Sequence, residues 1–376
     1  MNRMRILLTG HDGYIGHVLT PMLLDRGHDV TGLDSCLYEG CGFAPQEDLH
    51  VPVIRKDIRD VTREELRGFD AIAHLAGISN DPLGDLAPRT TYSINHEASV
   101  RLAKLAKQAG VSRFVFSSSC SNYGAAGDDY LTEEASFNPV TPYAESKVWT
   151  ERDVAPLADD TFSPTFLRSS TAYGVSARLR GDLVVNNLVG YAYTTGQVLI
   201  KSDGMPWRPL VHIEDISRAF TAVLEAPREL IHKEAFNVGR TQENYRVREV
   251  AQMVSEIVPK SKVTYAGDAS PDKRNYRVSC DKIAERLPGY QPTWTVRKGI
   301  EQVYDAFRRH ATSESEFLSS QFVRLKRIKE LQDSGTLDQS LSWRTRRGAK
   351  TVGPGDAPLP QGAAHRSRDS QPAAQP

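Results

Sequence analysis

A glycine-rich turn between a strand and a helix most restricts the folds open to this chain. Arg5-Ile-Leu-Leu-Thr9 is a short apolar run typical of a buried strand, and Tyr14 to Arg26 has helical spacing that ends before Gly27. Between them lies Gly10-His-Asp-Gly-Tyr-Ile-Gly16. Glycines there allow a tight bend, and the free amides at the start of the helix attract phosphate oxygens. We expect a phosphate-binding turn, although the GxxGxxG spacing differs from the GxGxxG fingerprint and a merely tight turn would also fit.

Strands and helices continue to alternate along the first half of the chain. Further strands are expected at 29–33, 51–56, 70–75, 113–117 and 165–168, and helices at 88–108 and around Tyr143. The second half is less regular, with helices expected at 183–195, 246–258 and 298–309, a short strand at 198–201, and a strand end followed by a helix at 211–225. Alternation of this kind builds βαβ units, so the sequence predicts an α/β fold with a doubly wound parallel sheet.

We expect the chain to divide into four parts. A nucleotide-binding domain would occupy residues 1–175, with segments from about 207–240 returning to it, and a smaller, mainly substrate-binding lobe would occupy 176–310. Residues 311–343 have helical periodicity with several basic side chains, which indicates a solvated helix face. Residues 344–376 are rich in Gly, Pro, Ala and Gln, which predicts a disordered tail.

Charge and composition exclude several classes of partner. The chain has 47 basic and 47 acidic residues, so no overall field attracts nucleic acid or an acidic membrane. No apolar run approaches the ~20 residues of a membrane span, and the start lacks the pattern of a signal peptide. The four cysteines, Cys36, Cys41, Cys120 and Cys280, have neither paired spacing nor a matching His cluster. We therefore expect free thiols in a reducing cytoplasm and no metal site.

A tyrosine and a lysine four residues apart form the candidate reactive pair. Tyr143 and Lys147 fall on one face of a helix, where the ammonium can stabilise the phenolate. An unperturbed tyrosine, with a pKa near ~10, is a poor base at neutral pH, whereas one beside a fixed cation becomes usable. The same spacing would also suit an unreactive surface pair on an amphipathic helix.

Asp34 bears on the choice of cofactor. It ends the second expected strand, about 20 residues after the glycine turn, where a carboxylate can accept hydrogen bonds from the adenosine ribose hydroxyls. A carboxylate in this place repels a 2′-phosphate, and no arginine follows it to bind one, because Ser35 and Cys36 come next. The residue therefore favours NAD over NADP.

These motifs, taken in order, resemble the extended short-chain dehydrogenase/reductases that act on nucleotide sugars, the NAD-dependent epimerase/dehydratase group. The likeness runs from about Met4 to Arg309 and rests on ThrGlyHisAspGlyTyrIleGly at the first turn, Asp57-Ile58, His74-Leu-Ala-Gly77, Asn95, the serine run before Gly124, and the Tyr143/Lys147 pair. The resemblance implies a Rossmann fold, NAD as cofactor, a nucleotide-sugar substrate and a homodimer.

The resemblance also implies a role for each matching residue. The cofactor would be bound by Gly10, Gly13, Tyr14, Ile15, Gly16, Asp34, Asp57, Ile58, Leu75, Ala76, Gly77, Tyr143 and Lys147. Ser119 would hydrogen-bond the sugar oxygen that Tyr143 deprotonates, and Lys147 would hold the nicotinamide ribose and lower the pKa of Tyr143. Substrate phosphates would be bound by Asn187, Arg208 and Arg274, although a structural ion pair would also explain either arginine. His212 and Asp215 are expected to be structural.

The residues after Ser119 bear on the reaction. Dehydratases of dTDP-glucose carry Asp and Glu directly after the corresponding hydroxyl residue, whereas this chain has Cys120 and Ser121, which cannot serve as acid and base for elimination at ordinary pKa. Cys120 is expected to be a packed thiol. We therefore expect C4 epimerisation through a transient 4-keto sugar. A deoxysugar ketoreductase or dehydrogenase, a dehydratase, and a non-catalytic NAD-responsive binding protein remain as alternatives.

Overall fold

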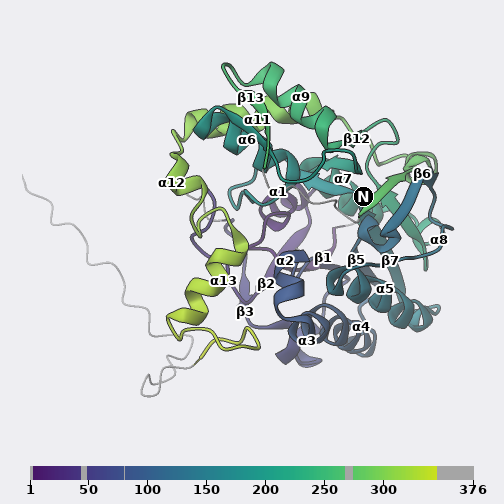
Figure 1. Cartoon of the computed structure of the whole chain (residues 1–376). Helices are drawn as coiled ribbons and strands as arrows, with labels where there is room; N and C mark the ends of the chain where they lie inside the picture. The colour runs from purple at the N-terminus through teal and green to yellow at the C-terminus, as the bar shows by residue number, and fades with distance from the viewer. Residues whose placement is uncertain (1–2, 44–48, 80, 267–273, 345–376) are drawn as a thin grey trace, which may run out of the picture.

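A seven-stranded parallel sheet forms the centre of the computed structural model, which describes residues 3–43, 49–79, 81–266 and 274–344 (Figure 1). The strand order is β11-β7-β5-β4-β1-β2-β3, and every neighbouring pair is parallel. The strands are β1 (Arg5–Thr9), β2 (Asp29–Asp34), β3 (Val53–Arg55), β4 (Ala71–His74), β5 (Arg113–Ser119), β7 (Ser163–Ser169) and β11 (Ala235–Val238). The order reverses beside β1, as in the doubly wound Rossmann fold, so the predicted fold class is confirmed.

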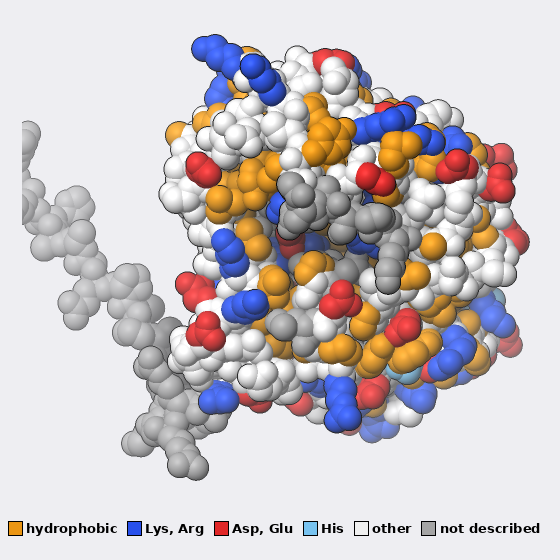
Figure 2. Space-filling model, in the orientation of Figure 1, with side chains coloured by type: hydrophobic (Ala, Val, Ile, Leu, Met, Phe, Trp, Pro, Cys, Tyr) orange, Lys and Arg blue, Asp and Glu red, His pale blue; other side chains and the backbone are white. Residues whose placement is uncertain are grey.

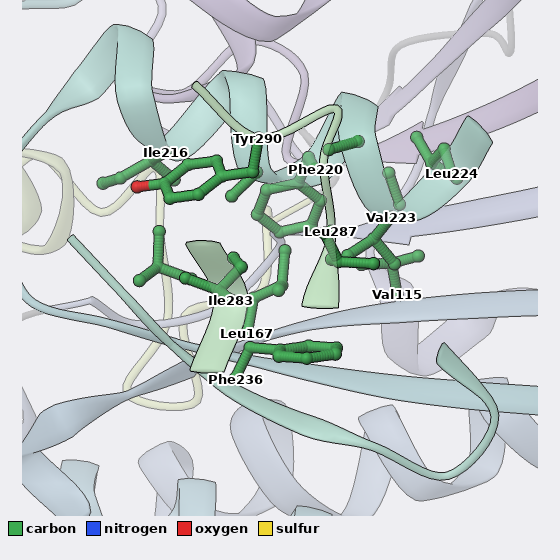
Figure 3. Close-up of a cluster of buried hydrophobic side chains, with 14 of the residues drawn as sticks. Val115, Leu167, Ile216, Phe220, Val223, Leu224, Phe236, Ile283, Leu287 and Tyr290 are labelled. Atoms are coloured by element: carbon green, nitrogen blue, oxygen red, sulfur yellow. The ribbon is translucent and has the colours of Figure 1, made fainter. Parts of the chain in front are cut away.

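Helices cover both faces of this sheet because its strands are apolar on both sides. Ile6 and Leu8 of β1 pack with α1 (Gly16–Asp25) and α7 (Ile213–Glu225), whereas Leu7 between them points to the opposite core with α4 (Ala98–Ala109) and α5 (Pro142–Val154). Figure 3 shows Phe220, Val223 and Leu224 of α7 facing Val115, Leu167 and Phe236 of the sheet. Each face of the sheet therefore has its own hydrophobic core.

The expected helix at 88–108 is divided into three parts. It consists of α3 (Pro88–Tyr92), a π-helical turn at Ser93–Glu97 and α4, which ends at Gly110 with a φ of +85°. A π turn adds one residue to a helical turn and redirects the side chains that follow, often at functional sites. Here the turn carries Asn95, which is buried.

The smaller lobe gathers α6 (Val184–Thr195), α9 (Val247–Ile257) and α11 (Val296–Arg309) around a third core, at the top of Figure 1. Small sheets complete the fold, namely β12-β10-β8 (Asn244–Arg246, Trp207–His212, Thr171–Tyr173), β13-β9 (Lys262–Tyr265, Gln197–Ile200) and β14-β6 (Asn275–Val278, Ala125–Leu131). Further short helices are α2 (Asp81–Leu86), α8 (Arg228–Ile231) and α10 (Asp281–Arg286). Within the described ranges, no helix has the length and apolarity needed to cross a bilayer.

The extension after α11 has only part of the solvated basic face that its sequence suggests. It forms two short helices, α12 (Glu314–Phe317) and α13 (Arg324–Asp333). Phe317 and Ile328 are buried at 1% and 0% exposure, and Arg324 is buried too, whereas Lys326 and Lys329 are exposed. The expectation is wrong for Arg324 alone, because apolar residues spaced along the extension turn one side of it inward and Arg324 lies on that side. Of the predicted tail, residues 345–376 lie outside the described residues.

Truncation of Phe317 tests whether the extension belongs to the fold. Phe317→Ala should lower the free energy of unfolding by about 3–5 kcal/mol, because it leaves a cavity beside α6 and Phe307. Urea unfolding followed by circular dichroism measures the change. Tyr265→Ala, at a side chain that is 56% exposed, is the control and should cost far less. If both substitutions lowered the free energy of unfolding equally, Phe317 would not be packed in the core as the structure places it.

Candidate active site

A cavity of about 1000 Å³ opens at the carboxyl ends of the parallel strands, where the smaller lobe meets the sheet. Figure 2 shows a hollow near the middle of this face, with hydrophobic side chains gathered beside charged ones. Its lining includes all seventeen residues to which the sequence analysis gave a site role, namely Gly10, Gly13, Tyr14, Ile15, Gly16, Asp34, Asp57, Ile58, Leu75, Ala76, Gly77, Ser119, Tyr143, Lys147, Asn187, Arg208 and Arg274. The fold therefore brings them together, although their individual roles stay predictions.

The glycine turn is shaped by close backbone packing. A Cβ on Gly10, whose φ is +76°, would lie 2.8 Å from the Ala76 nitrogen, and one on Gly16 would lie 2.2 Å from the His11 carbonyl oxygen. Both positions require glycine. A Cβ on Gly13, by contrast, would meet only the Gly10 carbonyl, at 3.0 Å. The turn is therefore tightly packed on its inner side and leaves space on the side of the cavity.

Tyr14 joins this turn to the smaller lobe. Its hydroxyl donates to the Gly174 carbonyl at 2.7 Å and accepts from Asn186 Nδ2 at 3.2 Å. Burial raises the pKa of this phenol well above its ordinary value, so Tyr14 stays protonated. Asn186 has a structural task as well, because its Oδ1 accepts from the Gly174 amide at 3.1 Å.

Two carboxylates, Asp34 and Asp57, lie at or just after the carboxyl ends of β2 and β3. Asp34 ends β2, and its oxygens accept from the amides of Cys36 at 2.8 Å and Asp12 at 3.1 Å. Burial raises the pKa of Asp34. Asp57 caps a short helical turn and is paired with Arg59, whose Nη2 lies 2.7 Å from Oδ2. Backbone amides thus fix the orientation of Asp34 at the cavity wall.

The middle of the cavity wall depends on Asn95 of the π turn. Its Oδ1 accepts from the Ile78 amide at 2.7 Å and its Nδ2 donates to the Ile78 carbonyl at 2.9 Å. A Cβ on Gly77 would approach Asn95 Oδ1 to 2.9 Å. His74, at the end of β4, bonds Thr9 and Ser99, and burial lowers its pKa to about 3, so it is a neutral structural residue.

The candidate reactive pair, Tyr143 and Lys147, lies at the start of α5. Thr141 caps this helix by accepting from the Ala144 amide at 3.2 Å, and Pro142 occupies the first turn, so the helix begins just before Tyr143. Lys147 Nζ lies 5.7 Å from the centre of the Tyr143 ring and donates to the Ser117 carbonyl at 2.8 Å. Burial lowers the pKa of Lys147 to about 7, although Glu151 acts in the opposite direction.

Ser119 and Cys120 point in different directions at the end of β5. Ser119 lines the cavity, and its Oγ accepts from the Ser121 amide at 3.1 Å and the Ser121 hydroxyl at 2.9 Å. Cys120 is 0% exposed and donates to the Arg168 carbonyl at 3.0 Å, and burial raises the pKa of its thiol. Cys120 is thus a packed thiol, as expected from its sequence position.

The three polar residues predicted to bind substrate phosphates also line the cavity, and two of them, Arg208 and Arg274, are linked. Arg208 Nη1 donates to the Trp207 carbonyl at 2.7 Å and to the Arg274 carbonyl, so one arginine holds the backbone of the other. Asn187 donates to the Gly181 carbonyl at 2.7 Å. His212 stacks on Trp294 and Asp215 accepts from backbone amides in the same loop, which is the structural use expected of both.

Several lining residues were not found from the sequence. They are Tyr38, Arg180, Asp182, Tyr191, Lys201, Phe317, Arg324 and Leu341. Tyr38 follows the carboxyl end of β2, and the general rule that such loops line the ligand site could have identified it. Arg324 gave no such signal, because its backbone partner Arg178 is 146 positions away in the sequence.

Comparisons with known proteins agree with this arrangement. A model of the NAD dependent epimerase/dehydratase family matches residues 6–239. UDP-glucose 4-epimerase of Corynebacterium glutamicum is 27% identical over 269 residues, which cover 68% of this chain and 80% of that protein. DesIV, a dTDP-glucose 4,6-dehydratase from Streptomyces venezuelae solved with NAD, has a TM-score of 0.72 at 25% identity, over 83% of this chain and 100% of that chain. UDP-glucose 4-epimerase of Thermus thermophilus in complex with NAD has a TM-score of 0.68 at 25% identity, over 81% of this chain and 99% of that chain.

The lowered pKa of Lys147 predicts a pH-dependent stability. An unfolded lysine has a pKa of ~10.4, so between pH ~7 and ~10 the unfolded chain binds one proton more than the folded chain, and stability rises with pH. Lys147→Met removes this rise, on the order of 4 kcal/mol over that range. Urea unfolding of the nucleotide-free protein across the range measures it. Lys104→Met, at an exposed lysine of α4, should keep the slope of the parent protein, and a parent protein without any such slope would refute the assignment.

Proposed function

Because the chain belongs to the NAD-dependent epimerase/dehydratase family, we propose that it epimerises a nucleotide sugar at C4 through a transient 4-keto sugar. The observation that carries this proposal is the cavity wall around Ser119. Tyr143 and Lys147 line the cavity with Ser119, whereas Cys120 is turned into the core. The described residues that line the cavity include three carboxylates. Asp34 ends β2, Asp57 follows β3, and Asp182 is paired with Arg180. None of them follows Ser119, where a dehydratase needs its acid and base.

The described residues fit NAD as the cofactor. The glycine turn leaves space toward the cavity and meets the start of α1, which suits a diphosphate. Asp34 is fixed by two backbone amides and can accept hydrogen bonds from ribose hydroxyls. Leu75, Ala76 and Gly77 would line the middle of the cofactor, and Asp57 and Ile58 would flank its adenine. When bound, NAD supplies a reversible acceptor of hydride from the sugar carbon.

The residues of this chain then account for the proton transfers. Ser119 Oγ holds the sugar oxygen, and Tyr143 removes its proton. Protonated Lys147 stabilises the phenolate, since the buried ammonium lies in a medium of low dielectric where charge interactions are strong. Asn187, Arg208 and Arg274 would bind the phosphates of the nucleotide. The sugar turns within the cavity, and Tyr143 returns the proton to the same oxygen, so no redox partner is consumed.

One other reaction has specific support from the comparisons. The likeness to DesIV, at the same 25% identity as the likeness to the Thermus thermophilus epimerase, supports a dehydratase. A deoxysugar ketoreductase would use every residue named for the epimerase, and its reaction would differ only in causing a net redox change.

We also propose that the protein is a homodimer, on the strength of the family resemblance. Light scattering of the purified protein tests this.

Replacement of the catalytic phenol tests the mechanism. Tyr143→Phe should lower the kcat for interconversion of UDP-glucose and UDP-galactose on the order of 10²–10⁴-fold, because the proton acceptor is lost. The NAD content of the purified variant should not change. Cys120→Ser is the matched control, since its hydroxyl can still donate to the Arg168 carbonyl, and it should retain activity. An active Tyr143→Phe enzyme would exclude this role for the tyrosine.

Hydrogen exchange with solvent separates the candidate reactions. During C4 epimerisation in D₂O, Tyr143 exchanges protons only with a sugar oxygen, so the product should carry no deuterium on carbon. A dehydratase would release water and place solvent deuterium on carbon, and a ketoreductase would change the ratio of NAD⁺ to NADH. Mass spectrometry and proton NMR of the products distinguish the three. Release of water from the sugar, or a stoichiometric change in NADH, would contradict the epimerase proposal.

A further inference from the structure

The extension formed by residues 311–344 is anchored in two cores. Phe317 and Phe322 lie in the core of the smaller lobe, whereas Ile328 lies in the core between the sheet and α4. Phe317 fits against α6 because Gly190 has no side chain, since a Cβ there would lie 2.2 Å from the phenyl ring. Figure 1 shows α12 and α13 running from the smaller lobe toward β2 and β3. The extension therefore spans from one lobe to the other along the cavity.

The extension also forms part of the cavity wall. Its lining residues are Phe317, Leu318, Val323, Arg324, Lys326 and Leu341. Trp343 Nε1 donates to the Ser35 carbonyl at 2.6 Å, directly after Asp34. Arg59 Nη2 links Asp57, at 2.7 Å, to Ser342 Oγ, at 2.9 Å. The extension thus contacts both loops that carry the carboxylates expected at the adenosine end.

Arg324 places a buried cation on this wall. The residue is 5% exposed, and its guanidinium carbon lies 3.9 Å from the centre of the Tyr38 ring. Nη2 donates to the Arg178 carbonyl at 3.3 Å. Nη1 is buried and has no hydrogen-bond partner among the described residues. The guanidinium is therefore held through Nη2, whereas the N–H donors of Nη1 are not used by the described parts of the chain.

The neighbouring arginines differ from Arg324 in their counterions. Arg178 is paired with Asp12 at 2.5 Å, and Arg180 with Asp182 at 2.9 Å. Arg324 has no carboxylate partner within the described parts of the chain. A guanidinium stays protonated in a protein, and a buried charge without a counterion is strongly unfavourable. The site thus has one buried positive charge that an anion entering the cavity would neutralise.

We propose that Arg324 binds the diphosphate of the cofactor, so that the C-terminal extension completes the NAD site. A guanidinium presents paired donors that suit phosphate oxygens. The surroundings of Arg324 point to the cofactor: Tyr38 follows the Asp34 loop, and Arg178 is ion-paired with Asp12 of the glycine turn. In a doubly wound fold the dinucleotide diphosphate binds at that turn. The diphosphate of a nucleotide sugar has the same chemistry, so the experiment must separate the two ligands.

Binding of three nucleotides to full-length protein stripped of cofactor provides the test. Calorimetry with ADP-ribose, adenosine and UDP compares Arg324→Gln with the parent protein. We expect ADP-ribose to bind on the order of 10- to 100-fold more weakly to the variant, because a charge-assisted hydrogen bond is lost. Adenosine, which has no phosphate, and UDP, which represents the substrate, should bind as before. The variant should also copurify with less NAD.

The control is Lys329→Gln, which removes the same charge from an exposed position of α13 and should leave all three affinities unchanged. An unchanged affinity for ADP-ribose would overturn the proposal, and so would a loss confined to UDP or an equal loss for adenosine and ADP-ribose. If Arg324→Gln does not fold, Arg324→Lys keeps the charge without the paired donors and must still weaken ADP-ribose more than UDP. The proposal rests on NAD as the cofactor but not on the reaction, because the measurements are of binding and not of turnover.

Discussion

The position of Tyr143, the proposed base, depends on a series of buried polar contacts between α5 and the ends of β5 and β7. Lys147 donates to the Ser117 carbonyl at 2.8 Å, and one turn further along Glu151 pairs with Arg168 at 2.7 Å. The three charged residues are no more than 6% exposed. A shift of the helix along the sheet would leave a buried charge without its partner, at a cost of about 3–5 kcal/mol. The helix therefore has a single favourable register, and Tyr143 is positioned with it.

The nucleotide-binding half could be predicted because local and tertiary preferences agree there. Residues 5–9 and 113–117 form apolar runs that suit strands buried on both faces, and they become β1 and the greater part of β5. The place of Gly10 and Asp34 in the cavity wall could be predicted for a related reason. Carboxyl ends of parallel strands meet at one edge of a sheet, so residues distant in sequence but equivalent in position converge on one cavity.

The parts that could not be predicted depend on partners far away in the sequence. β6 is exposed along most of its length and has no apolar alternation, and it is a strand because β14, beginning at Asn275, pairs with it. The basic residues of the extension predict a solvated helix face, yet Arg324 lies against Tyr38 and the Arg178 carbonyl. No local pattern distinguishes this arginine from the exposed Lys329 on the same helix.

The way the extension enters both cores also limits how the halves of the molecule can move. Phe317 and Ile328 are separated by only a short stretch of chain, and each is fully packed in a different lobe. A hinge motion that separated the lobes widely would have to withdraw the phenyl ring or the isoleucine into water, at a cost of about 2–5 kcal/mol. The extension therefore resists separation of the two lobes on the side where it lies.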